Sequence, residues 1–298
     1  MRDPTQQRES IGETPNPLGL DGIEYIEYST ARPQALGQVL ETLGFKPVAR
    51  HRSREVLLYR QGGMNVVVNA HAGVVRGLAA TDEAAPAIRA LALRVRDARA
   101  AYERALELGA WEVPMHAQVM ELNIPGIHGP GGAHLYFVDR YNEFSIYSVD
   151  FVPIPGVDPQ PPARDGLHFF GVVQYIGRGR TADWTEFYGR LFGFVRLPGQ
   201  TRFGVMPKGE LLQSPGDARQ RFYLQLIEPE AGAAGPAEPE LFQRIGLGTA
   251  DVPAAVATLR RHGVDFVDTG NAADSARGAL TCNVLDSVAF ELVHDEQP

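Results

Sequence analysis

The sequence predicts an α+β fold made of two tandem modules, each with paired βαβββ units and curved, mostly antiparallel sheets. The main observation is an internal repeat at long period. A strand followed by a helix that ends at Gly-Phe occurs at Gly22–Phe45 and again at Leu167–Phe194. A second strand–helix pair and a closing strand also occur twice. The composition agrees, because 298 residues with 44% hydrophobic and 21% charged side chains fit a soluble globular chain that could form two compact domains or one large one.

The first copy shows both periodicities that define such a module. Apolar and polar side chains alternate along its strands, whereas Val95, Ala98, Tyr102 and Leu106 form one apolar stripe with helical spacing. The expected elements are strands at Gly22–Ser29, Val56–Tyr59, Asn65–Asn69, Ala92–Asp97 and His134–Arg140, and helices at Pro33–Leu43 and Ala98–Leu108.

The second copy repeats this order and has its own glycine stop signals after helices. Its expected elements are strands at Leu167–Ile176, Arg221–Ile227, Ile245–Asp251 and Val288–His294, and helices at Asp183–Leu191 and Val252–His262. Because both copies carry the same elements, every special residue in one can be compared with its equivalent in the other.

The proline-rich segment Val152–Ala163 divides the two copies, since its composition resists helix and sheet interior alike. The sequence therefore predicts a flexible N-terminal arm at residues 1–16, a first module at 17–151, an extended linker at 152–164 and a second module at 165–298.

Charge and composition exclude several classes of partner. The formal net charge is −8 without a basic run, so we expect no nucleic-acid partner. No apolar run approaches the ~20 residues that span a bilayer, so we expect no membrane partner. The polar start lacks a signal peptide, and the lone Cys282 fits a reducing compartment, which predicts a cytoplasmic protein. The sequence leaves open whether the chain forms a homo-oligomer.

Five segments carry a resemblance to a known family. Four of them resemble the first domain of 4-hydroxyphenylpyruvate dioxygenase: Gly22–Ser29 (GIEYIEYS), Ala49–Gly62, Glu121–Gly132 and Val138–Phe151 (VDRYNEFSIYSVDF). The fifth, Arg178–Phe194 (RGRTADWTEFYGRLFGF), is similar to the start of its second domain. This family belongs to the vicinal-oxygen-chelate superfamily. The resemblance implies that both modules have that superfamily's fold.

The resemblance also implies a first module without metal and a second module that binds iron(II) through two histidines and one glutamate. Imidazole and carboxylate ligands would leave one face of the iron open for a 2-oxo acid and oxygen. The three positions fall here on Gly171 (or Val172), Arg244 and Glu291, so only Glu291 matches. His168 is a weak substitute ligand, since strand alternation puts it on the opposite face unless a bulge intervenes. The cofactor is therefore either Fe(II), by resemblance, or none.

Arg244 and Glu291 are the main candidate catalytic residues. The two side chains could form an internal ion pair, Arg244 could hold the carboxylate of an organic acid, or Arg244 could face solvent. Gln225 is a candidate substrate-binding residue by its place in the resemblance, although a solvent-facing glutamine fits the alternation as well. In module one the equivalent positions are Tyr25, Ala90 and Tyr136. The two phenols could bind a ligand or simply pack.

Three functions follow as hypotheses. The first is a 4-hydroxyphenylpyruvate dioxygenase-like protein of aromatic amino acid catabolism, which binds or oxidises an aromatic 2-oxo acid or similar small aromatic acid. The second is a metal-free ligand-binding pseudoenzyme. The third is a metal-independent lyase or isomerase with Glu291 as general base and Arg244 as electrophile. Metal content separates the first from the other two.

Overall fold

The structure, a computed structural model, describes most of the chain. The described residues are 16–71, 85–114, 122–142, 144–199, 201, 203–205, 209–229, 240–268 and 276–296. The predicted N-terminal arm falls outside them except for its last residue. None of the helices within these ranges has the length and apolar character needed to cross a membrane.

Module one contains eight strands and three α-helices among the described residues. The strands are β1 (Leu20–Ser29), β2 (Lys46–His51), β3 (Val56–Gln61), β4 (Met64–Asn69), β5 (Ala87–Val95), β6 (Gly126–His128), β7 (His134–Val138) and β8 (Phe151–Pro153). The helices are α1 (Pro33–Leu43), α3 (Ala98–Glu107) and α4 (Ile146–Asp150), with a 3₁₀ turn η1 (Pro130–Gly132).

Module two repeats this order within the part of the chain that the structure describes. Its strands are β9 (His168–Tyr175), β10 (Val195–Arg196), β11 (Glu210–Gln213), β12 (Tyr223–Ile227), β13 (Leu241–Thr249), β14 (Gly278–Leu280) and β15 (Phe290–His294). Its helices are α5 (Thr181–Phe192) and α6 (Val252–Arg261), and the 3₁₀ turn η2 (Arg164–Gly166) precedes β9.

Strand pairing gives the two modules the same topology. In module one β1 pairs with β4 in parallel and with β5 antiparallel, and β7 pairs with β5 in parallel. In module two β9, β12, β13 and β15 pair in the same senses. The remaining pairs are antiparallel, as predicted, and the parallel pairs join strands separated by a helix, as crossover connections require. One residue pair, Phe242 with Ile88, joins β13 to β5 and makes the sheet continuous across the modules.

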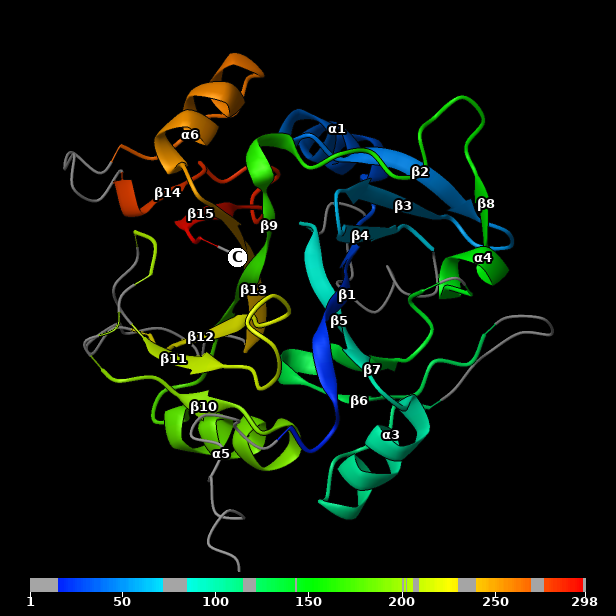
Figure 1. Cartoon of the computed structure of the whole chain (residues 1–298), viewed down its shortest axis with the longest axis vertical. Helices are drawn as coiled ribbons and strands as arrows, with labels where there is room; N and C mark the ends of the chain where they lie inside the picture. Colours follow the sequence, from blue (N-terminus) through cyan, green and yellow to red (C-terminus); the bar gives the residue numbers. More distant parts are fainter. Residues whose placement is uncertain are drawn as a thin grey trace, which may run out of the picture.

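Figure 1 shows the modules side by side, with strands β1, β5, β9 and β13 near the centre and helices α1, α3, α5 and α6 at the periphery. A large apolar core runs through both modules under these helices. A second apolar cluster lies in module one beneath α4 and includes Tyr25, Tyr147 and Phe151.

Local chemistry explains the helix ends. Gly44 and Gly193 follow α1 and α5 with φ of 109° and 77°, a left-handed backbone that glycine adopts without a Cβ penalty. Asp97 and Asp251 precede α3 and α6, and each carboxylate accepts a hydrogen bond of 2.9 Å from a backbone N–H in the first turn. These signals are readable from sequence, and the predicted helices agree with the observed ones to within two residues.

The segment predicted as an extended linker begins differently. Phe151–Pro153 forms the edge strand β8, which pairs antiparallel with β2 through Arg50 and Val152. The start of the predicted linker is therefore part of the module-one sheet. Proline has no backbone N–H to donate, and an edge strand tolerates it because one row of its backbone groups is unpaired in any case.

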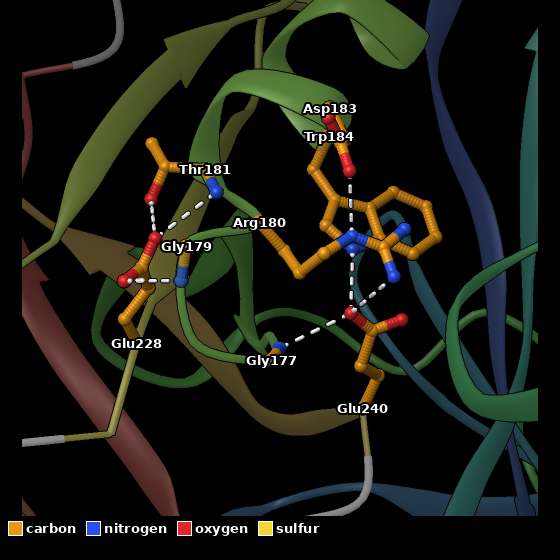
Figure 2. A network of polar contacts seen from close by, with 8 residues as sticks. All are labelled: Gly177, Gly179, Arg180, Thr181, Asp183, Trp184, Glu228 and Glu240. Carbon is orange, nitrogen blue, oxygen red and sulfur yellow. Dashed lines mark hydrogen bonds and ion pairs between the residues drawn. The ribbon is translucent and has the colours of Figure 1, made fainter.

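A carboxylate holds the turn that precedes α5 (Figure 2). Glu228, at the end of β12, accepts hydrogen bonds from the backbone N–H groups of Gly179 and Thr181 and from the Thr181 hydroxyl. Chiefly because of the hydroxyl bond, the pKa of Glu228 lies below its usual value. A carboxylate at a helix N-terminus is stabilised by the unpaired N–H groups there.

A second carboxylate ties the start of β13 to the same turn. Glu240 Oε1 accepts a hydrogen bond of 3.1 Å from the backbone N–H of Gly177 and another of 3.1 Å from Trp184 Nε1. Arg180 Nη1 lies 3.7 Å from the same oxygen (Figure 2). Glu228 and Glu240 together fix β12 and β13 relative to α5, and so position the strands that carry the candidate site.

Candidate functional site

The strand register brings the three predicted ligand positions onto one face of the module-two sheet. Gly246 of β13 pairs with Gly171 of β9 on one side and with Glu291 of β15 on the other. Arg244 lies two residues before Gly246 and so shares its face. This face, which carries Arg244 and Glu291, is called the module-two site below.

Module one has the same register. Ala92 of β5 pairs with Tyr25 of β1 and with Tyr136 of β7, and Ala90 lies two residues before Ala92. Tyr25, Ala90 and Tyr136 are thus the equivalents of Gly171, Arg244 and Glu291. The register settles the open choice in favour of Gly171, since Val172 is one residue away and faces the other side.

Arg244 and Glu291 form a buried ion pair. Arg244 Nε lies 3.1 Å from Glu291 Oε2, and both residues are 3% exposed. The other carboxylate oxygen, Oε1, accepts a hydrogen bond of 2.9 Å from the backbone N–H of Val205. Arg244 Nη1 donates to Gln243 Oε1 at 3.0 Å, but its buried Nη2 has no hydrogen-bond partner among the described residues. Of the three alternatives, the structure shows the internal ion pair and excludes an Arg244 that faces solvent, and the Nη2 group of Arg244 remains without an acceptor among the described residues.

Gly171 could not carry a ligand in this backbone. A Cβ at that position would come within 2.2 Å of the carbonyl oxygen of Tyr223 on β12, which is closer than any real contact. Beside it the ring of Phe170 stacks on Tyr223 with centroids 4.7 Å apart and meets Phe203 at 5.0 Å. At this position β9, the first strand of module two, therefore brings an aromatic ring and not an imidazole to the site.

His168 lies on the same face because a register shift interrupts β9. The shift falls between the pairs Gly246–Gly171 and Leu247–Phe169, so His168 pairs with Gly248. The bulge considered from sequence is thus present, and the expectation of the opposite face is wrong. His168 Nε2 lies 3.0 Å from Asp295 Oδ2 and Nδ1 lies 3.2 Å from the carbonyl oxygen of Gly166. Both ring nitrogens already have oxygen partners.

Gln225 lies in the same row as Arg244. It pairs with Val173 of β9, which in turn pairs with Arg244 of β13. Two strand spacings separate Gln225 from Arg244, or roughly 10 Å. Along β12 the residues Tyr223, Gln225 and Ile227 are half-buried, whereas the two leucines between them are buried on the helix side. Gln225 thus faces the module-two site, on the side opposite Glu291.

Comparisons with known proteins agree with this geometry. The family model described as "Hydroxyphenylpyruvate dioxygenase, HPPD, N-terminal" matches residues 14–152. A 4-hydroxyphenylpyruvate dioxygenase of Pseudomonas sp. (strain P.J. 874) is 43% identical over 61% of this chain and 51% of its own length. A 4-hydroxyphenylpyruvate dioxygenase of Pseudomonas aeruginosa is 34% identical over 86% of this chain and 74% of its own length.

The chain belongs to the 4-hydroxyphenylpyruvate dioxygenase family. It spans about half the length of the first of these relatives. A solved structure, a mutant of 4-hydroxymandelate synthase from Streptomyces coelicolor, is similar over 93% of both chains with a TM-score of 0.69 and 18% identity. That likeness supports the paired-module vicinal-oxygen-chelate fold of the family.

Within the 4-hydroxyphenylpyruvate dioxygenase fold, module one presents phenols where module two presents the ion pair. Tyr25 belongs to the second apolar cluster, and the partly buried Tyr136 packs against it. Burial raises the pKa of Tyr25 far above its ordinary value, and burial also raises the pKa of Tyr136. The Tyr136 hydroxyl lies 3.1 Å from His134 Nδ1. These contacts agree with the packing interpretation of the two tyrosines.

The sequence analysis did not identify two groups near these positions. The backbone N–H of Val205 reaches Glu291 from a segment between β10 and β11, far from it in sequence. Glu27 of module one lies in the row of Ala90, and its carboxylate accepts a hydrogen bond of 2.9 Å from Asn69 Nδ2. Burial raises the pKa of Glu27, and the Asn69 hydrogen bond opposes that rise. Alternation along β1 could have placed Glu27 on this face.

Proposed function

We propose that this member of the 4-hydroxyphenylpyruvate dioxygenase family binds a small aromatic acid, of the aromatic 2-oxo acid class, at the module-two site without iron. The observation that carries the proposal is the buried Arg244, which pairs with Glu291 and keeps a second N–H group without an acceptor. A guanidinium is always charged and offers several donors in a fixed plane, which suits a carboxylate.

The donor set does not fit an iron(II) centre. Gly171 offers no side chain, and Arg244 has no lone pair for a cation. Both oxygens of Glu291 already accept hydrogen bonds, from Arg244 and Val205. No group of three histidine, cysteine or carboxylate side chains within the described residues could hold a metal. The proposed function therefore uses no iron step.

Arg244 and the residues near it offer a contact for each part of such a ligand. Leaving the buried Nη2 group unpaired costs free energy, and a ligand carboxylate would remove that cost with a charge-assisted hydrogen bond. Phe170, Phe203 and Tyr223 form an aromatic cluster on the same module, where an aromatic ring could stack. Gln225 offers an amide at the far side of the row.

The geometry does not favour Glu291 as the general base of a lyase or isomerase. Both oxygens of this carboxylate already accept hydrogen bonds, one from the Arg244 guanidinium and one from the Val205 N–H, so taking a proton from a substrate would disturb these bonds. A binding role therefore fits this arrangement better than acid–base catalysis by Glu291.

Ligand titration combined with metal analysis tests the proposal. Calorimetric titration with 4-hydroxyphenylpyruvate should give saturable binding to protein that holds far less than one equivalent of iron. The double variant Arg244→Leu/Glu291→Leu should lose that binding, and Arg190→Leu, which changes an exposed arginine on α5, should keep it. One equivalent of tightly held iron together with oxygen-dependent turnover would contradict the iron-free proposal.

A further inference from the structure

A cavity lies between the two modules, and neither Arg244 nor Glu291 lines it. Its volume is about 920 Å³. Module one supplies the start of β1 and the residues that follow β5 and β7, and module two supplies the connection from β11 to β12. Pockets of this size at a boundary between structural units are common places for small ligands.

Two arginines of this cavity have donor groups without an acceptor among the described residues. Arg96, from module one, is exposed, and no described residue accepts a hydrogen bond from its guanidinium. Arg221, from module two, is half-buried, and its Nε is buried without a hydrogen-bond partner among the described residues. The Nη2 group of Arg221 makes only a long contact of 3.5 Å with the carbonyl oxygen of Gly216. A ligand carboxylate could accept hydrogen bonds from both guanidinium groups.

Three aspartates of the same cavity each have one local partner. Asp21 accepts a hydrogen bond of 3.0 Å from the Tyr141 hydroxyl, Asp139 accepts one of 3.1 Å from a backbone N–H at the start of α3, and Asp217 accepts one of 3.1 Å from the backbone N–H of Arg219. Each carboxylate keeps lone pairs for a further donor. Within the cavity, two positive and three negative side chains therefore stand together.

We propose that this inter-module cavity binds a small zwitterion, an α-amino acid. The arginines would take its carboxylate, and the aspartates would take its ammonium group. A plain anion would meet repulsion from the three carboxylates, and a plain cation would leave the arginines without acceptors, so a molecule with both charges complements the cavity best. The lining is mostly polar, with Leu20, Pro215 and Ala218 as its aliphatic exceptions, which favours a polar amino acid.

Arg221 connects this cavity to the module-two site. The positive charge of Arg221 acts on the hydroxyl of Tyr223, whose ring stacks on Phe170. A ligand that draws Arg221 toward the cavity would weaken that electrostatic interaction. The inter-module cavity is nonetheless a separate site, because Arg96 and the three aspartates lie outside the module-two site.

Screening the common L-amino acids by thermal shift, followed by titration of the strongest hit, tests the proposal on the whole chain. Affinity should fall about tenfold or more in Arg96→Gln and in Arg221→Gln, because each loses a charge-assisted hydrogen bond. Arg219→Gln is the matched control, since Arg219 is exposed on the same connection but does not line the cavity, and it should bind as the unchanged chain does.

Two analogues of the hit separate the ligand classes. The counterpart without the amino group and the counterpart without the carboxylate should each bind at least tenfold more weakly than the amino acid itself. Equal binding of either counterpart would overturn the zwitterion assignment. Absence of any hit, or a hit that Arg96→Gln leaves unchanged, would overturn the site.

Discussion

Breaking the Arg244–Glu291 pair from one side should destabilise the protein strongly. Both residues are 3% exposed, and the Arg244→Leu change would leave the Glu291 carboxylate buried with only the Val205 N–H as a donor. Losing one partner of a buried pair costs about 3–5 kcal/mol. Since 1 kcal/mol shifts the melting temperature of a domain of such size by roughly 2–4 °C, we expect a fall on the order of 6–20 °C. Thermal or urea unfolding followed by circular dichroism measures it.

Two further variants test the reasoning. Replacing both residues, as Arg244→Leu/Glu291→Leu, removes the uncompensated charge and should recover much of the loss, because apolar side chains of similar volume often replace a buried pair without cost. Arg190→Leu breaks the exposed pair with Glu186, whose atoms lie 3.2 Å apart, and should cost about 0–1 kcal/mol. The reasoning fails if Arg244→Leu costs no more than Arg190→Leu, or if the double variant is less stable than the single one.

Three more predictions concern the surroundings of the site. Because burial raises the pKa of Glu27, the folded state loses stability as pH rises from the ordinary carboxyl pKa towards the raised one. Glu27→Gln should therefore stabilise the protein at pH 7. The gain in stability should shrink below about pH 4, where the carboxyl group is protonated in both states. A gain of equal size at both pH values in urea unfolding would contradict this. Gly171→Ala places a Cβ 2.2 Å from a carbonyl oxygen of β12 and should lower the stability of the protein by about 1–3 kcal/mol. Gly189→Ala lies within helix α5, where the nearest atom to the new Cβ is 3.6 Å away, and should stabilise the protein by about 0.5–1 kcal/mol. Equal effects of the two variants in thermal melts would refute the steric argument. Glu240→Ala leaves the buried Trp184 N–H without its acceptor and should cost about 1–3 kcal/mol in urea unfolding, and an unchanged midpoint would count against the network.

The sequence by itself determined the repeat, the helices α1, α3, α5 and α6, and the strand on which each candidate lies. Helix ends follow from signals within a few residues, such as Gly44 after α1 and Asp251 before α6, so no distant contact is needed to place them. The resemblance to the family implied that Arg244 and Glu291 share one site, and the observed pairing of β13 with β15 brings them together.

Only the tertiary structure decided which groups meet at the site. A register shift between β9 and β13 turned His168 onto the face of Glu291, and period-two alternation cannot foresee such a shift because it depends on the fit between two strands. The Val205 N–H reaches Glu291 across 86 residues of sequence. The cavity between the modules depends likewise on how segments distant in sequence pack. Side-chain type and period are local properties, whereas register, bulges and inter-module contacts are set by the packing of the whole chain.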